Sequence, residues 1–157
     1  MRKSLVIVAA VVLASLLLVL LATAPGHTAP TFKLSVFTAV LNGAQEVPPD
    51  ASTAMGSALL TLDEPQAKLC VYVSSNVTGE SAAHIHGTAF PGVDAAILFP
   101  LTTGNPKLDC FTLTKPQVKD LKAGLFYINI HTGAFSGGEI RGQILPAGKG
   151  FYFKVPD

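Results

Sequence analysis

Three of the four histidines in the chain are spaced so that they could bind one metal ion together. His84 and His86 are separated by one residue in the stretch AHIHG, and His131 follows later in NIHT. Side chains at positions i and i+2 of a β-strand point to the same face, so His84 and His86 share a face if this stretch is extended. Three neutral imidazoles suit copper(II) or zinc. The spacing predicts a candidate metal centre, with a polar sheet face that merely carries imidazoles as the alternative.

Polar residues near His131 are predicted to surround this centre. Strand alternation places Asn129 on the same face as His131, and in GEIRGQI it places Glu139 and Arg141 on one face. If these faces adjoin, Asn129, Glu139 and Arg141 form a second layer of contacts around the imidazoles. Glu139 is then the nearest candidate for a fourth ligand, unless Arg141 holds it in a salt bridge.

Other catalytic motifs are absent from the sequence. It contains no Gly-x-Ser-x-Gly turn of a serine esterase and no phosphate-binding loop. A pair of carboxylates flanking a cleft cannot be identified either. We therefore assign no catalytic residue, and we favour a binding or structural protein over an enzyme.

The charge balance argues against nucleic acid as a partner. Charged residues make up 13% of the 157 residues, and the formal net charge is +1. Arg2 and Lys3 are two of the eleven basic residues, so no basic stripe remains in the rest of the chain to meet a phosphate backbone. The length suits one domain and a targeting segment.

Residues 1–24 have the pattern of an export signal, in which two positive charges precede a long apolar run. The sequence ATA at 22–24 has the form of a cleavage site, but a proline follows it, and the apolar run is long enough to span most of a membrane. We expect either a cleaved signal peptide or a retained transmembrane anchor. In both cases the rest of the chain is extracytoplasmic, and any membrane contact runs through residues 1–24 alone. Residues 25–31 are expected to be a linker and residues 32–157 the folded domain.

The two cysteines, Cys70 and Cys110, are predicted to form a disulfide, because an exported chain with an even cysteine count usually pairs them. The alternative is two buried free thiols, which pack as small apolar side chains.

From Phe32 onward, short apolar runs alternate with turn residues, which is typical of an antiparallel β-sandwich with Greek-key connections. One segment differs from this pattern. In KPQVKDLKAG, Pro116 suits the first turn of a helix and Gly124 suits its end, which predicts a single short helix or turn near residues 116–122.

Three sequence blocks, in order, resemble the CHRD domain, the module named after chordin. They are LNGAQEVPP at 41–49, AHIHG at 83–87, and the stretch 121–143 that contains YINIHT and GEIRGQ. The resemblance covers about residues 32–145 and implies an extracytoplasmic β-sandwich that acts as a binding or structural module for an unknown partner.

The arrangement also resembles, distantly, the sandwich of copper/zinc superoxide dismutase, with a His-x-His strand and a late Gly-rich segment that carries an arginine. That resemblance implies an immunoglobulin-like or dismutase-like sandwich. A dinuclear site needs more histidines than the three that follow the linker. The second expectation for function is therefore a mononuclear copper or zinc protein with a redox or metal-buffering role, and copper or zinc is the cofactor implied.

Overall fold

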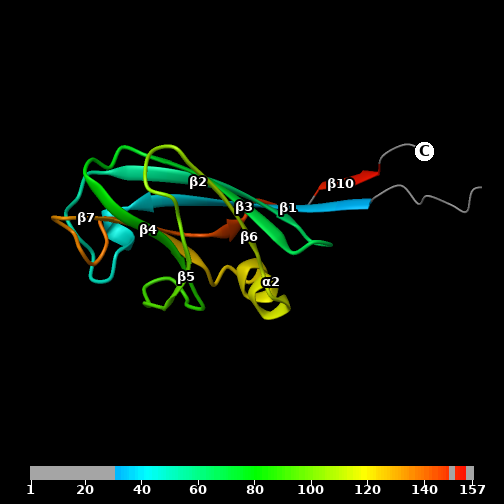
Figure 1. Ribbon diagram of the computed structural model, residues 1–157. Coiled ribbons are helices and arrows are strands. Elements are labelled where there is room, and N and C mark those ends of the chain that lie inside the picture. Colours follow the sequence, from blue (N-terminus) through cyan, green and yellow to red (C-terminus); the bar gives the residue numbers. More distant parts are fainter. Residues whose placement is uncertain (1–30, 149–150, 155–157) are drawn as a thin grey trace, which may run out of the picture. The chain divides into compact units, whose positions relative to one another are not determined.

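The chain folds into antiparallel strands that surround one apolar core (Figure 1). The computed structural model describes residues 31–148 and 151–154, and Thr31–Phe153 form one unit. The expected signal or anchor at 1–24 and nearly all of the expected linker lie outside the described residues. Within the described ranges, no helix is long and apolar enough to cross a membrane.

The elements follow one another as mostly short strands. In chain order the strands are β1 (Thr31–Asn42), β2 (Met55–Asp63), β3 (Lys68–Ser75), β4 (Glu80–His86), β5 (Ile97–Pro100), β6 (Lys107–Thr112), β7 (Tyr127–Thr132), β8 (Ile140–Gln143), β9 (Leu145–Pro146) and β10 (Phe151–Lys154). A 3-10 turn, η1 (Gly43–Gln45), follows β1, and one helix, α2 (Lys115–Lys122), lies between β6 and β7. The predicted all-β fold with one short helix near 116–122 is confirmed.

Strands that are distant in sequence lie side by side in the sheet. Its order is β5-β4-β7-β8-β1-β2-β3-β6, with β9 and β10 also paired to β1. The long strand β1 connects the two halves, because it pairs with β2 over residues 34–42 and, along its other edge, with β8 and β9. These non-local neighbours place the two histidines of β4 beside β7, which carries the third.

Alternation along the strands builds the core. On β1, Phe37, Ala39 and Leu41 are buried, whereas Thr38 and Val40 between them are exposed. The inward positions of the other strands include Leu60, Leu62, Leu69, Val71, Val73, Ile85, Ile128, Ile130 and Ile140. Burying each large aliphatic side chain contributes about 1.5–3 kcal/mol, so this core holds the two halves of the sheet together.

Side chains close the seam between β5 and β6, the two end strands of the sheet. Phe99 of β5 stacks on Phe111 of β6, with ring centroids 4.7 Å apart. Lys107 of β6 forms an ion pair with Glu80 of β4 and donates a hydrogen bond of 2.6 Å to the Gly104 carbonyl. The Lys107 and Glu80 side chains are only 2% and 10% exposed, so each charge depends on the other for compensation.

Local sequence sets both ends of the helix α2. The Thr114 hydroxyl accepts a hydrogen bond from the Gln117 N–H, and the Gln117 side chain accepts one from the Thr114 N–H, which is a capping box. Pro116 lies in the first turn, where its missing N–H costs nothing. Gly124 follows the helix with a φ of 73°, a left-handed conformation that favours glycine.

The predicted disulfide between Cys70 and Cys110 is confirmed, and the alternative of free thiols is excluded. The two cysteines lie directly opposite each other on β3 and β6. The bond ties the end strand β6 to its neighbour across a sequence separation of 40 residues. In the chain-entropy model such a cross-link stabilises the fold by about 3–4 kcal/mol.

We predict that Lys107→Met destabilises the protein by about 3–5 kcal/mol, because it leaves the buried Glu80 carboxylate without a counter-charge. Urea unfolding measures the change. Lys122→Met is the matched control, since the Lys122 side chain is 42% exposed in its ion pair with Glu64, and it should cost less than about 1 kcal/mol. Equal effects of the two substitutions would contradict the prediction.

Candidate metal centre

The face of β4, β7 and β8 that points away from the core is polar but largely buried. Two loops, 43–50 and 87–96, lie over it. From the first loop Glu46 accepts hydrogen bonds of 2.8 and 2.9 Å from the Asn129 amide, and in the second Asp94 forms a 3.0 Å ion pair with Arg141. Glu46, Asn129 and Arg141 are 7%, 4% and 1% exposed. The two loops therefore cover the part of this face around these three side chains, whereas His84 and His131 are only partly buried.

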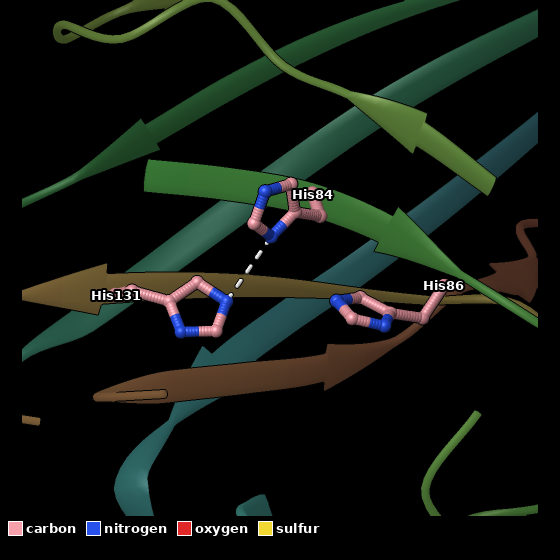
Figure 2. A group of neighbouring side chains, drawn as sticks. All are labelled: His84, His86 and His131. Carbon is pink, nitrogen blue, oxygen red and sulfur yellow. Dashed lines mark hydrogen bonds between the residues drawn. The ribbon is translucent and has the colours of Figure 1, made fainter. Parts of the chain in front are cut away.

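The three predicted histidines come together on this face. His84 and His86 project from β4, and His131 projects from the neighbouring strand β7 (Figure 2). Each offers one ring nitrogen, and these nitrogens all lie within 4.8 Å of one another. The Nδ1 atom of His84 and the Nε2 atom of His131 are 3.2 Å apart. Among the described residues this cluster of metal-binding side chains contains no carboxylate, so Glu139 is not a member of it.

Two main-chain carbonyls fix which nitrogen of two of the rings carries the proton. His86 Nδ1 lies 3.0 Å from the Ala95 carbonyl oxygen, and His131 Nδ1 lies 3.0 Å from that of Ser136. Since a carbonyl oxygen can only accept, Nδ1 of each ring must donate, and the Nε2 atom of each neutral ring carries the lone pair. The His131 lone pair accepts the 3.2 Å hydrogen bond from His84 Nδ1, so a cation bound there would replace that proton. The Nε2 atom of His86 is buried and has no hydrogen-bond partner.

The surroundings favour the neutral, metal-binding form of the imidazoles. Burial lowers the pKa of His84 below its usual value, and the neighbouring His131 and His86 lower it further. Burial also lowers the pKa of His86, and this effect outweighs the hydrogen bond to the Ala95 carbonyl, which raises it. Both rings therefore hold their lone pairs at neutral pH.

A stack of three planar groups holds the His86 ring in place. The rings of His86 and Tyr127 are nearly parallel, 5° apart in orientation, with centroids separated by 4.8 Å. The Arg141 guanidinium carbon lies 3.5 Å from the centre of the Tyr127 ring, a cation–π contact. The Tyr127 hydroxyl accepts a 3.1 Å hydrogen bond from the N–H of Ala95, whose carbonyl contacts His86.

The predicted second layer divides among different partners. Arg141 pairs with Asp94 and donates to the Val93 carbonyl, whereas Glu139 accepts a 2.9 Å hydrogen bond from Ser52. Arg141 and Glu139, whose salt bridge was one of the alternatives from the sequence, thus bind different partners. Asn129 lies directly opposite His84 in the strand register and holds Glu46 through its amide.

Sequence reasoning missed the residues that the two loops contribute, Glu46, Asp94 and Ala95. Glu46 stands in the block QEVPP, which belongs to the family pattern and carries no recognisable ligand or catalytic motif. Burial raises the pKa of Glu46 to about 7, with Asp50 as the next contributor in the same direction. The local sequence, a glutamate between a glutamine and a valine, contains no signal that the side chain of Glu46 is buried.

We predict that the pH dependence of stability changes in Glu46→Gln. The folded-state pKa of Glu46 is raised from 4.5 to about 7, so the stability it contributes is complete below pH 4.5 and is lost as the pH rises through 7. This shift corresponds to about 3 kcal/mol, which the wild-type protein should lose and the variant should keep. Urea unfolding at pH 4.5 and pH 8 measures the difference, with Glu139→Gln as the control. Parallel pH profiles of wild type and Glu46→Gln would contradict this assignment.

Comparison with known proteins agrees with the resemblance seen in the sequence blocks. A family model described as the CHRD domain matches residues 37–144, which include all three histidines, both loops and both cysteines. Neither a search of curated proteins nor a search of solved structures finds a match. The family match spans well over half of the chain, from β1 to beyond β8. The chain therefore belongs to the CHRD domain family.

Proposed function

We propose that this CHRD domain binds a single copper or zinc ion through His84, His86 and His131. One observation carries the proposal: three imidazole nitrogens from two adjacent strands lie within 4.8 Å of one another, and one of them is buried without a partner. An unpartnered buried nitrogen is unfavourable in water-free surroundings, and a bound cation would satisfy its lone pair.

The distances suit a small transition-metal ion. Nitrogen ligands about 2.0–2.1 Å from a tetrahedral ion lie about 3.4 Å from one another. The His84 Nδ1 and His131 Nε2 atoms are 3.2 Å apart across a hydrogen bond, so a bound ion would take the place of the shared proton at close to that spacing. Three neutral imidazoles without a carboxylate leave one coordination position for water or a small exogenous ligand, which fits copper(II) and zinc better than magnesium or calcium.

The proposed setting is extracytoplasmic. Residues 1–24 have the pattern of an export signal or membrane anchor, and the disulfide between Cys70 and Cys110 fits an oxidising compartment. In that setting a mononuclear site of this kind would buffer metal or support redox exchange.

A second candidate function is that of a module that binds another protein. Leu59, Tyr72 and Leu108 lie opposite one another on β2, β3 and β6, on the face that points away from the core. They are 50%, 46% and 72% exposed, and together they form a short apolar stripe across three strands. This stripe is on a different sheet region from the histidines, so the two functions are separable by mutation.

We predict that the full-length, metal-free protein binds one equivalent of copper(II) or zinc, as measured by titration calorimetry and by metal analysis after gel filtration. His84→Ala and His131→Ala should each reduce the affinity by about 100-fold or more, since loss of an outer contact alone typically costs 10–100-fold. His27→Ala, which removes the histidine that precedes the domain, is the matched control and should bind like wild type. Binding that survives in both variants, or no binding in wild type, would refute the metal site and leave the protein-binding function.

A further inference from the structure

A pocket lies between loops 43–50 and 87–96, on the same polar side of the domain as the histidines. It has a volume of about 460 Å³, and its floor is formed by Arg141 and Gln143 of β8. Residues 44–47 and Pro49 line one side, and Pro91 and Gly92 line the other. None of the three histidines lines this pocket, so it is a separate site from the candidate metal centre.

Side-chain donors of the pocket lining bond to acceptors of the protein itself. Gln143 donates through its amide to the carbonyls of Ala89 and Gly124, at 3.0 and 2.7 Å. Arg141 donates to Asp94 and Val93. The Asn129 amide faces Glu46.

Acceptors, by contrast, are in excess. Both oxygens of the buried Glu46 carboxylate share a single donor atom, Asn129 Nδ2, although a carboxylate can accept about four hydrogen bonds. Among the buried side-chain atoms without a partner, the amide oxygen of Gln143 belongs to a residue of the pocket lining. A ligand that suits this pocket must therefore bring donors.

The charges around the pocket point to a cationic donor. Glu46 lines the pocket, and both Asp50 and Asp94 act on it with negative charge, opposed only by Arg141. Arg141 and Asp94 form an ion pair and largely offset each other, so Glu46 and Asp50 remain as the excess negative charges. The side walls are apolar, since Val47, Pro49 and Pro91 belong to the lining.

We propose that the pocket between loops 43–50 and 87–96 binds a primary ammonium group on a short aliphatic stem, with the Glu46 carboxylate as its acceptor and the proline and valine walls around the stem. A compact ammonium carries three donors and reaches a nearly buried carboxylate better than a bulky cation. The same chemistry is offered by a free alkylamine and by a lysine side chain of a partner protein.

Binding should strengthen as the pH rises. The charged and polar groups that face Glu46 are Asp50 from its own loop, Asp94 from the other loop, Arg141 from β8 and Asn129 from β7. Burial and Asp50 hold the pKa of Glu46 at about 7, so its carboxylate is mostly protonated at pH 6 and mostly ionised at pH 8. An ammonium ion binds the ionised form, and we expect its apparent affinity to be about tenfold higher at pH 8 than at pH 6.

The test is an NMR titration of the full-length protein, kept metal-free with a chelator, with n-butylammonium chloride at pH 6 and pH 8. n-Butanol and sodium butyrate are the neutral and anionic probes of similar shape. We expect saturable shifts in residues of both loops with n-butylammonium only, and about tenfold or greater weakening in Glu46→Gln. Glu139→Gln, which alters a carboxylate bonded to Ser52 outside the pocket lining, should bind like wild type.

Several outcomes would overturn the proposal. Butyrate binding in place of n-butylammonium would make Arg141 the recognition group and the ligand an anion. No saturable binding, or binding without pH dependence in the wild-type protein, would remove Glu46 from the site even if Glu46→Gln failed to fold. A comparison of n-butylammonium with N-acetyl-lysine methylamide distinguishes the sources: tighter binding of the lysine derivative supports a protein partner, and equal binding supports a free amine.

Discussion

The polar side of this domain depends on one fully buried cation, the guanidinium of Arg141. A charge so far from water is stable only where other groups satisfy it. Asp94, the Val93 carbonyl and the face of the Tyr127 ring do so from three directions. Two of these partners belong to loop 87–96. The same docking of this loop therefore both satisfies the Arg141 charge and covers the polar face of the sheet. That loop in turn brings the Ala95 carbonyl to His86.

The same loop also helps to order the histidines. The two carbonyls that contact His86 and His131 leave one nitrogen of each ring facing the common space, and the Tyr127 ring restricts the tilt of His86. Pre-orientation of this kind lowers the cost of assembling a site when an ion arrives. The neighbouring pocket uses the same loops as walls, so both candidate sites rest on the docking of residues 43–50 and 87–96.

The sequence predicted what depends on short-range pattern. Period-two alternation identified the shared face of His84 and His86 and the inward positions of β7, and proline and glycine signals located α2. The pairing of Cys70 with Cys110 had only one possible solution. In contrast, the partner of Arg141 is 47 residues away in a loop with no regular pattern, whereas the sequence offered only Glu139, two residues away, as a possible partner. The docking of such a loop depends on tertiary packing, which cannot be predicted from local sequence patterns.

The contact between His86 and the Ala95 carbonyl has a consequence for how the site tolerates change. The acceptor belongs to the main chain, so it is present whatever side chain occupies position 95. Substitutions there would leave the orientation of the imidazole intact, while an inserted or deleted residue in loop 87–96 would displace the carbonyl and release the ring. The geometry of the centre is therefore encoded in the length of a loop as much as in the identity of its residues. Two chains that share the three histidines but differ in the number of residues between His86 and the position of Ala95 need not share the same site.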